Sequence, residues 1–318
     1  MASQIWTEKY RPQNFEEVKG QKEIIDRIKS LVENKNIPHL LFSGPAGTGK
    51  TTTALIIAKK LHKDNWRNNF LELNASDARG IDTIRNQVKD FAKTMGIQAE
   101  ESPKIILLDE ADALTKEAQQ ALRRTMETYA SSCRFILSCN FPSKIIDPIK
   151  SRCAIFQFKP LNEGAIEEII TNIANKEELN LEEETIKILF KQCNGDVRQL
   201  QNILQSTSSV TKNINQEAVS GFVSKIEAKE VEEILTLAIK NKFLEARKIL
   251  LDLMYLRGLS GTEIVKQIQK EIMNLSIDDE KKLSIIDKCG DIEFRLVEGS
   301  DDYIQLESLL AYICLKTK

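Results

Sequence analysis

Short runs of consecutive apolar residues alternate with segments of helical periodicity through the first half of the chain. Strands and helices that repeat in this way are typical of a parallel sheet with helices packed on it. Runs that are apolar at successive positions are typical of parallel strands buried on both faces. The pattern predicts four such strands, over residues 39–44, 70–75, 104–110 and 134–140, and a fifth strand over residues 154–158.

The pattern changes beyond Pro160, where strand-like runs disappear and apolar residues recur at spacings of three and four. Such spacing predicts amphipathic helices. Residues 163–176, 182–193 and 196–209 are predicted to form three helices of a small bundle. Longer amphipathic stretches follow from about residue 227 and predict a second all-helical unit.

Length and composition limit the number of domains and the class of protein. A chain of 318 residues favours two or three domains. The formal net charge is −2, so any affinity for nucleic acid requires a local basic surface. The six cysteines form no CxxC pair, and with two histidines the sequence offers no zinc site. There is no signal-peptide pattern and the apolar runs are too short to span a bilayer, so we expect a soluble intracellular protein.

Between the first predicted strand and the next helix lies the octapeptide GPAGTGKT, which matches the phosphate-binding pattern GxxxxGK[ST]. In this motif backbone N–H groups and a helix N-terminus surround the phosphates, and glycines are needed where the backbone closes on them. The lysine meets the terminal phosphates and the threonine binds Mg²⁺. A glycine turn without a ligand is the alternative, and the strand and helix on either side argue against it. The motif comprises Gly44, Pro45, Ala46, Gly47, Thr48, Gly49, Lys50 and Thr51.

Two carboxylates, Asp109 and Glu110, end the third predicted strand, and Asn140 ends the fourth. The carboxyl edge of a parallel sheet is where ligands bind in open α/β folds. Asp109 can hold Mg²⁺, Glu110 can polarise the attacking water, and Asn140 can orient that water or the γ-phosphate. The alternatives are a solvated acidic strand end and an asparagine in an ordinary turn. Together with the phosphate-binding loop, the acidic pair predicts an ATP-hydrolysing site.

The segments GPAGTGKT, LLDEADALT, LSCN, SRC and GDVRQ follow the opening WTEKYRP in this order. They resemble the small subunit of replication factor C, in its archaeal version more than its eukaryotic one, and the resemblance is dense from Trp6 to about Arg198. It implies an AAA+ protein in which an α/β P-loop domain with a parallel five-stranded sheet precedes a helical lid and an all-α collar. The expected domains are the AAA+ nucleotide-binding domain over residues 1–159, the lid over 160–224 and the collar over 225–318.

The resemblance also implies partners. Five such subunits form an open spiral with ATP and Mg²⁺ between neighbours, and the spiral loads the ring-shaped sliding clamp PCNA onto primer-template DNA. The implied partners are therefore a replication factor C large subunit, further small subunits in a pentameric ring, PCNA and primer-template DNA, with no membrane. The implied location is the cytoplasm, or the nucleus if the source is eukaryotic.

At the ATP site, the resemblance makes Asn140 the γ-phosphate sensor and Arg198 a second sensor in the lid. It makes Arg152, in SRC, an arginine finger that reaches the ATP of the adjacent subunit rather than its own. Without the resemblance, SRC is a polar turn with a surface arginine. The expected nucleotide-binding set also includes Thr52 and a segment near adenine and ribose, namely Thr7, Arg11, Pro12, Val18 and Lys19.

The resemblance further implies DNA contacts by Arg79, Arg85 and Lys89, which would follow phosphates without reading sequence. A solvated basic helix face is the alternative. Clamp contact would come from about residue 95 to residue 102, including Met95 and Ile97, and a plain connecting loop is the equal alternative.

Gln119 and Arg123 lie at i and i+4 of one predicted helix, and the resemblance implies that they couple the DNA face to the ATP site. Arg124 beside them would face DNA or a neighbouring subunit.

Two other functions are alternatives to a clamp-loader ATPase. An AAA+ DNA motor, such as a branch-migration helicase, would share the P-loop and sensors, but the SRC segment and the helix around LRRTME argue against it. A scaffold subunit without hydrolysis would not need the full set of Lys50, Thr51, Asp109, Glu110, Asn140 and Arg152.

Overall fold

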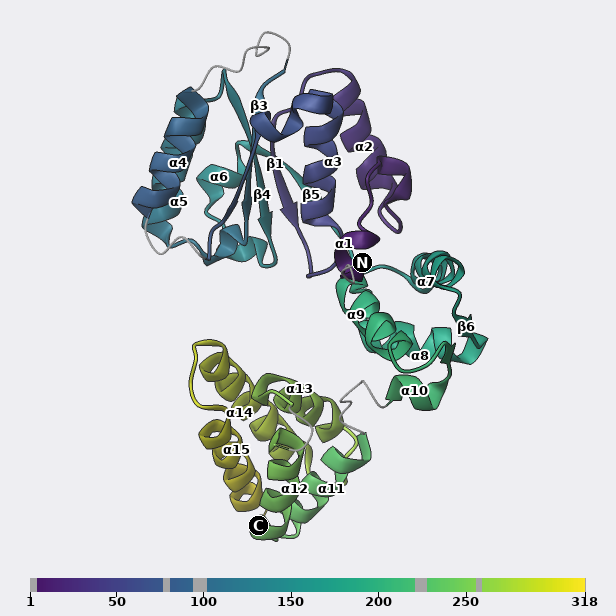
Figure 1. Ribbon diagram of the computed structural model, residues 1–318. Coiled ribbons are helices and arrows are strands. Elements are labelled where there is room, and N and C mark those ends of the chain that lie inside the picture. Colours follow the sequence, from purple (N-terminus) through teal and green to yellow (C-terminus); the bar gives the residue numbers. More distant parts are fainter. Residues whose placement is uncertain (1–4, 77–80, 94–101, 221–227, 256–258, 318) are drawn as a thin grey trace. The chain divides into compact units, whose positions relative to one another are not determined.

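The computed structural model describes residues 5–76, 81–93, 102–220, 228–255 and 259–317 (Figure 1). The chain divides into two compact units, Met1–Val219 and Ser220–Lys318. Among the described residues, no helix is long and apolar enough to cross a membrane.

The first unit contains a five-stranded parallel sheet with the strand order β2-β3-β4-β1-β5. The five predicted strands are confirmed, each to within one or two residues at its ends. In this order β3, β4 and β1 are neighbours, so their carboxyl ends lie side by side along one edge of the sheet. The strands are β1 His39–Ser43, β2 Phe70–Asn74, β3 Lys104–Asp109, β4 Cys133–Cys139 and β5 Cys153–Gln157.

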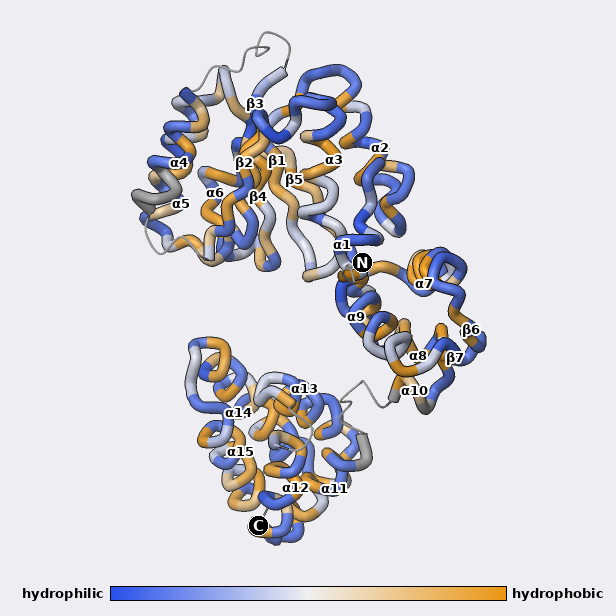
Figure 2. The backbone as a smooth tube through the Cα atoms, viewed as in Figure 1, coloured by the Kyte–Doolittle hydropathy of each residue, from blue (hydrophilic) through white to orange (hydrophobic). Residues whose placement is uncertain are grey.

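Helices cover both faces of this sheet (Figure 1). Leu40 and Phe42 of β1 pack into a core with α2 and α3, whereas Leu41 between them packs on the opposite face with α4, α5 and α6. This alternation follows from the two-residue period of a strand, and each fully buried leucine or phenylalanine contributes about 1.5–3 kcal/mol. Figure 2 shows apolar residues concentrated in the strands and polar residues on the outer helix faces. The helices are α2 Lys22–Glu33, α3 Lys50–His62, α4 Ile81–Lys93, α5 Lys116–Thr128 and α6 Asp147–Lys150.

The prediction that all of the first four strands are buried on both faces is wrong for β2. This strand lies at the edge of the sheet, and none of its five residues is fully buried. Its central residue, Glu72, is exposed. An edge strand has one neighbour instead of two, so its apolar residues are covered less completely than those of β3 or β4.

Short elements complete the α/β part. Helix α1 and the 3₁₀ turn η1 precede the first strand, and the 3₁₀ turns η2, η3 and η4 lie in the connections between strands. Their bounds are α1 Trp6–Lys9, η1 Phe15–Glu17, η2 Lys63–Asn69, η3 Ala111–Ala113 and η4 Pro142–Lys144.

The three helices predicted after Pro160 are present as α7 Glu163–Glu177, α8 Glu183–Cys193 and α9 Val197–Ser208, followed by α10 Gln216–Ser220. The side chains of Asn162 and Asp196 cap the N-termini of α7 and α9. The sequence pattern did not predict two short strands, β6 Asn180–Leu181 and β7 Asn213–Ile214, which pair in parallel beside these helices.

The described residues of the second unit are helical, as predicted. The helices pack around one apolar cluster that includes Leu250, Ile264 and Leu309. Ser260 and Glu263 form a capping box at the start of α13. The helices are α11 Ala228–Ile239, α12 Phe243–Tyr255, α13 Gly261–Ile272, α14 Asp279–Val297 and α15 Asp302–Lys316.

Candidate nucleotide-binding site

The loop between β1 and α3 owes its shape to glycines. Gly47 and Gly49 have φ angles of +67° and +98°, in the left-handed region that favours glycine. A Cβ atom on Gly47 would lie 1.7 Å from Oδ1 of Asp196, so the loop approaches α9 too closely for a side chain. Helix α3 begins at Lys50, and its unpaired N–H groups therefore face the loop. This arrangement is a cradle for an anion.

Lys50 is 8% exposed, and its ammonium group lies among oxygen atoms. Nζ donates to the carbonyl oxygens of Gly44 (2.7 Å) and Pro45 (2.8 Å) and to Oδ1 of Asn140 (3.0 Å). Burial lowers the pKa of Lys50 below its ordinary value, and the negative charge of Asp109 opposes that shift. The loop after β1 and the end of β4 are thus joined through one lysine.

The acidic pair follows β3 at the same sheet edge. The hydroxyl of Thr51 donates to Oδ2 of Asp109 at 2.6 Å, and Oδ1 of Asp109 accepts from the backbone N–H of Glu110 at 3.0 Å. Glu110 has a φ of +53°, which is uncommon for a residue with a side chain. Its side chain is exposed and lines the cavity described below.

Asn140 is held by a residue that the sequence interpretation did not single out. Oδ2 of Asp112, in η3, accepts from the backbone N–H groups of Asn140 (3.2 Å) and Phe141 (3.0 Å). Asp112 therefore ties the end of β4 to the turn that follows the acidic pair. The segment LLDEADALT contains this aspartate, but its three-residue distance from Asp109 did not indicate which strand it would contact.

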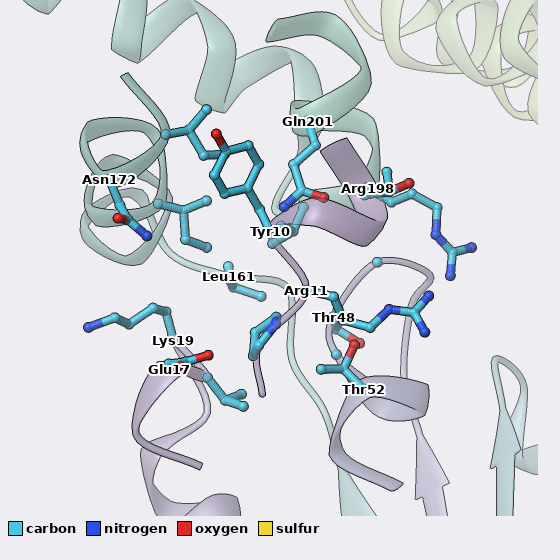
Figure 3. A pocket seen from close by; sticks show the side chains of 18 of the residues that line it. Tyr10, Arg11, Glu17, Lys19, Thr48, Thr52, Leu161, Asn172, Arg198 and Gln201 are labelled. Carbon is cyan, nitrogen blue, oxygen red and sulfur yellow. The ribbon is translucent and has the colours of Figure 1, made fainter. Parts of the chain in front are cut away.

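The first helical turn of α9 lies against the phosphate-binding loop. The N–H of Val197 donates to the carbonyl of Gly47 at 3.2 Å. The carboxylate of Asp196 accepts from the N–H groups of Arg198 (2.8 Å) and Gln199 (3.1 Å) and so caps the helix. Arg198 follows directly, and its exposed side chain lines the cavity (Figure 3).

A single cavity of about 1520 Å³ brings most of the predicted residues together. Among the predicted nucleotide-binding residues, Gly44 and Pro45 are absent from its lining, although their carbonyls bind Lys50. Pro45 lines a smaller neighbouring cavity of about 230 Å³. The predicted residues on the main lining are Thr7, Arg11, Pro12, Val18, Lys19, Ala46, Gly47, Thr48, Gly49, Lys50, Thr51, Thr52, Asp109, Glu110, Asn140 and Arg198.

The N-terminal segment closes one side of this cavity through ion pairs. Lys19 pairs with Glu168 of α7 at 2.8 Å, and Arg11 pairs with Glu8. Lys9 and Tyr10 both contact the carboxylate of Glu177, the last residue of α7. The segment thus connects the α/β part to the helices beyond Pro160.

One face of α7 was missed by the sequence interpretation. Gly164, Glu168, Asn172 and Lys176 lie four residues apart along α7 and line the cavity together. Figure 3 shows Asn172 there, with Gln201 of α9. Spacing of four defines a helix face. It could have indicated these residues only if the orientation of α7 had been known.

Arg152 lies outside its own chain's cavity. Its Nη2 forms an ion pair with Oε1 of Glu127 in α5 at 2.6 Å, and its Nη1 donates to the carbonyl of Pro148 at 2.7 Å. Glu127 also pairs with Arg123 at 3.3 Å. The structure therefore connects Arg152 to α5 rather than to Lys50.

Gln119 is 1% exposed, and its amide joins α5 to the loop after β4. Nε2 donates to the carbonyls of Leu114 (3.1 Å) and Lys144 (2.9 Å), and Oε1 accepts from the N–H of Ile146 (2.9 Å). Arg124, farther along α5, is exposed.

Lys89 is exposed on α4. The other DNA and clamp contacts that the sequence predicts lie outside the described part of the chain: Arg79, the side chain of Arg85, Met95 and Ile97.

These features, a P-loop on a parallel sheet with an acidic pair at the same edge, define a nucleotide-binding ATPase of the AAA class. The family "ATPase family associated with various cellular activities (AAA)" matches residues 40–161, and "Replication factor C C-terminal domain" matches residues 226–312. Solved structures agree on the fold: the Thermotoga maritima RuvB Holliday junction branch migration motor has a TM-score of 0.55 at 16% identity, covering 81% of this chain and 85% of that one.

Curated relatives named replication factor C small subunit match almost the whole chain. The one from Archaeoglobus fulgidus is 48% identical over 316 residues, covering 99% of this chain and 98% of the relative. Those from Methanococcus maripaludis (51%; 96% and 97%) and Sulfolobus acidocaldarius (48%; 98% and 96%) are similar. The chain belongs to the replication factor C small subunit family.

Proposed function

We propose that this chain is an ATPase subunit of a clamp loader, which uses ATP to open the sliding clamp PCNA and place it on primer-template DNA. The observation that carries the proposal is the meeting of Lys50, Thr51, Asp109 and Asn140 at one cavity in a chain of this family. Its proposed partners are a large subunit, further small subunits, PCNA and primer-template DNA, and its proposed domains are 1–159, 160–224 and 225–318.

The phosphates of ATP would occupy the loop from Gly44 to Thr51. Lys50 would exchange the carbonyls of Gly44 and Pro45 for phosphate oxygens, because a charged acceptor binds an ammonium group more strongly than a carbonyl does. Asn140 would remain beside Lys50 and contact the γ-phosphate. Arg198 would reach the same phosphates from α9.

The residues present fit a magnesium ion. The hydroxyl of Thr51 and the carboxylate of Asp109 are already within 2.6 Å of each other, and both are oxygen ligands of the kind that Mg²⁺ prefers. Bound there, Mg²⁺ would neutralise charge on the phosphates. Glu110, the next residue, would accept a proton from the attacking water.

The base and ribose would lie beside Thr7, Arg11, Pro12, Val18 and Lys19, on the side of the cavity that faces α7. Because Arg152 lies away from this cavity, it would complete the ATP site of the adjacent subunit. There its guanidinium would stabilise the negative charge on the transferred phosphoryl group in the transition state. Hydrolysis would then depend on assembly.

DNA phosphates would contact Arg79, Arg85 and Lys89 without sequence preference. Gln119 and Arg123 would couple DNA binding to the ATP site through α5. Gln119 binds the backbone of Lys144 and Ile146, which lie in the loop after Asn140.

Reconstitution tests the proposal. The chain is mixed with its large subunit, and ATP turnover is measured alone, with duplex or junction DNA, and with PCNA plus primer-template DNA. Stimulation that requires both PCNA and a primer-template junction is expected for a clamp loader. Stimulation by duplex or junction DNA alone would indicate a DNA motor, and unstimulated background turnover would indicate a scaffold.

A further inference from the structure

Helix α5 holds the chain between β4 and β5 at two places. Gln119, near the start of the helix, binds the backbone of Lys144 and Ile146. Glu127, near its end, pairs with Arg152. Between these two contacts lies the short helix α6, so both ends of the segment that leads to Arg152 are fixed to α5.

The contact at Glu127 is shared by two arginines. One carboxylate oxygen, Oε1, lies 2.6 Å from Nη2 of Arg152 and 3.3 Å from Nη1 of Arg123. Without a carboxylate between them, two guanidinium groups placed this way would repel each other. The carbonyl of Pro148 accepts from the remaining terminal nitrogen of Arg152 at 2.7 Å. Arg152 is thus held from both of its terminal nitrogens.

These ion pairs contribute little to folding. The side chains of Arg152 and Glu127 are 36% and 42% exposed, and ion pairs that are this exposed are screened by water. Their effect is on orientation, because an arginine side chain has many rotamers and each fixed contact removes some of them. A reaction is faster when the catalytic group that a neighbouring subunit supplies is already oriented before the reaction begins.

We propose that Glu127 is the positioning residue for Arg152: it holds the guanidinium in the direction from which it completes the ATP site of the adjacent subunit. Arg123 shares the same carboxylate, so α5 sets the position of Arg152 through Glu127. The inference rests on the proposed role of Arg152 in trans, and Glu127 itself touches no nucleotide in its own chain because it lies outside the cavity.

The test uses the clamp loader reconstituted with its large subunit, PCNA and primed DNA. Glu127→Gln keeps the size of the side chain and removes its charge. We expect kcat for ATP to fall about tenfold to a hundredfold, as misplaced catalytic groups commonly cause, with KM unchanged. Binding of ATP to the isolated chain and its melting temperature should equal those of the parent. Glu184→Gln, at an exposed position on α8, is the matched control and should change neither kcat nor KM.

Two further variants separate the possible failures. Arg152→Ala should abolish the stimulated turnover; if it does not, the trans role of Arg152 is wrong and the inference fails with it. If Arg152→Ala abolishes turnover but Glu127→Gln stays within about twofold of the parent, only the positioning role of Glu127 is rejected. A raised kcat in Glu127→Gln would reject it too, since the carboxylate would then restrain Arg152.

Should Glu127→Gln fold poorly, Glu127→Asp, whose shorter side chain draws the carboxylate back from Arg152, must show the same loss of kcat at constant KM.

Discussion

Nζ of Lys50 lies 3.0 Å from Oδ1 of Asn140, although the two residues are 90 positions apart in the chain. The contact joins the loop after β1 to the end of β4, which are neighbouring strands in the sheet. Lys50 also binds two carbonyls of its own loop, so the ammonium group has a full set of acceptors before any phosphate is present. A nucleotide must replace some of these acceptors to bind.

Lys50→Ala and Asn140→Ala should therefore differ in effect. Loss of Lys50 removes charge-assisted bonds worth about 1.5–3 kcal/mol, so ATP affinity should fall about tenfold to a hundredfold. Asn140→Ala leaves the ammonium in place and should lower turnover in the assembled complex much more than it lowers affinity. Calorimetry with ATP and Mg²⁺, together with turnover, measures both. Lys60→Ala, exposed on the same helix, should bind like the parent. Equal affinity losses in Lys50→Ala and Lys60→Ala would contradict the proposed role of Lys50.

Glu110→Gln should preserve ATP binding while turnover falls about a hundredfold or more, because the amide cannot accept a proton from water. The backbone conformation at residue 110 is left-handed, with a φ of +53°, and glutamine tolerates it as glutamate does. The fold should therefore be unaffected. The measurement is single-turnover hydrolysis in the reconstituted complex, with nucleotide binding measured in parallel. If hydrolysis continues at the parental rate, Glu110 is not the base.

Gly47→Ala should destabilise the first unit and disturb the contact between the phosphate-binding loop and α9. The new Cβ would lie 1.7 Å from Oδ1 of Asp196, and the φ of +67° is unfavourable for alanine. The left-handed backbone costs about 1–2 kcal/mol, and moving Asp196 from its capping position costs about 1 kcal/mol more.

A double-mutant cycle of Gly47→Ala with Asp196→Ala checks the cause of this loss. Once the aspartate is absent, the clash disappears, and adding Gly47→Ala should cost only the backbone term. Chemical denaturation of the four proteins gives the free energies of unfolding. Strict additivity of the two changes would show that the loop and Asp196 do not interact in this way.

The sequence predicted the elements that local pattern determines. The five strands, the phosphate-binding loop and the acidic pair are each encoded by consecutive residues. Because β1, β3 and β4 are neighbours in a parallel sheet, their carboxyl ends then bring Asp109 and Asn140 near Lys50. Burial of β2 was predicted wrongly because its apolar run does not reveal that it lies at the sheet edge. Local sequence determines which element forms, but neighbours determine how much of it is covered.

The missed parts of the candidate site all depend on contacts between distant segments. Asp112 binds the backbone of Asn140, Asp196 approaches Gly47, and Glu127 pairs with Arg152. Each of these carboxylates is one of several charged residues in its own segment. Nothing in helical spacing or charge pattern indicates which distant backbone or guanidinium group it will reach.

The half-buried His39 gives the stability of the first unit a predictable dependence on pH. Its Nδ1 accepts from the backbone N–H of Phe135 at 3.1 Å, so the ring is neutral in the folded state. Burial, aided by the charge of Arg134, lowers the pKa of His39 from 6.5 to about 4. The unfolded chain therefore takes up a proton first as the pH falls, and stability present above pH 6.5 is lost progressively between about 6.5 and 4, on the order of 3 kcal/mol.

His39→Asn isolates this contribution, because the side-chain oxygen of asparagine can accept from Phe135 but does not titrate in this range. Thermal unfolding followed by circular dichroism between pH 7 and pH 4.5 should show a steeper decline for the parent than for the variant. Carboxylates contribute equally to both proteins, so the difference between the two curves reports on His39 alone. If the two curves stay parallel across that range, the imidazole has the same pKa in the folded and unfolded states, and the pH dependence of stability arises elsewhere.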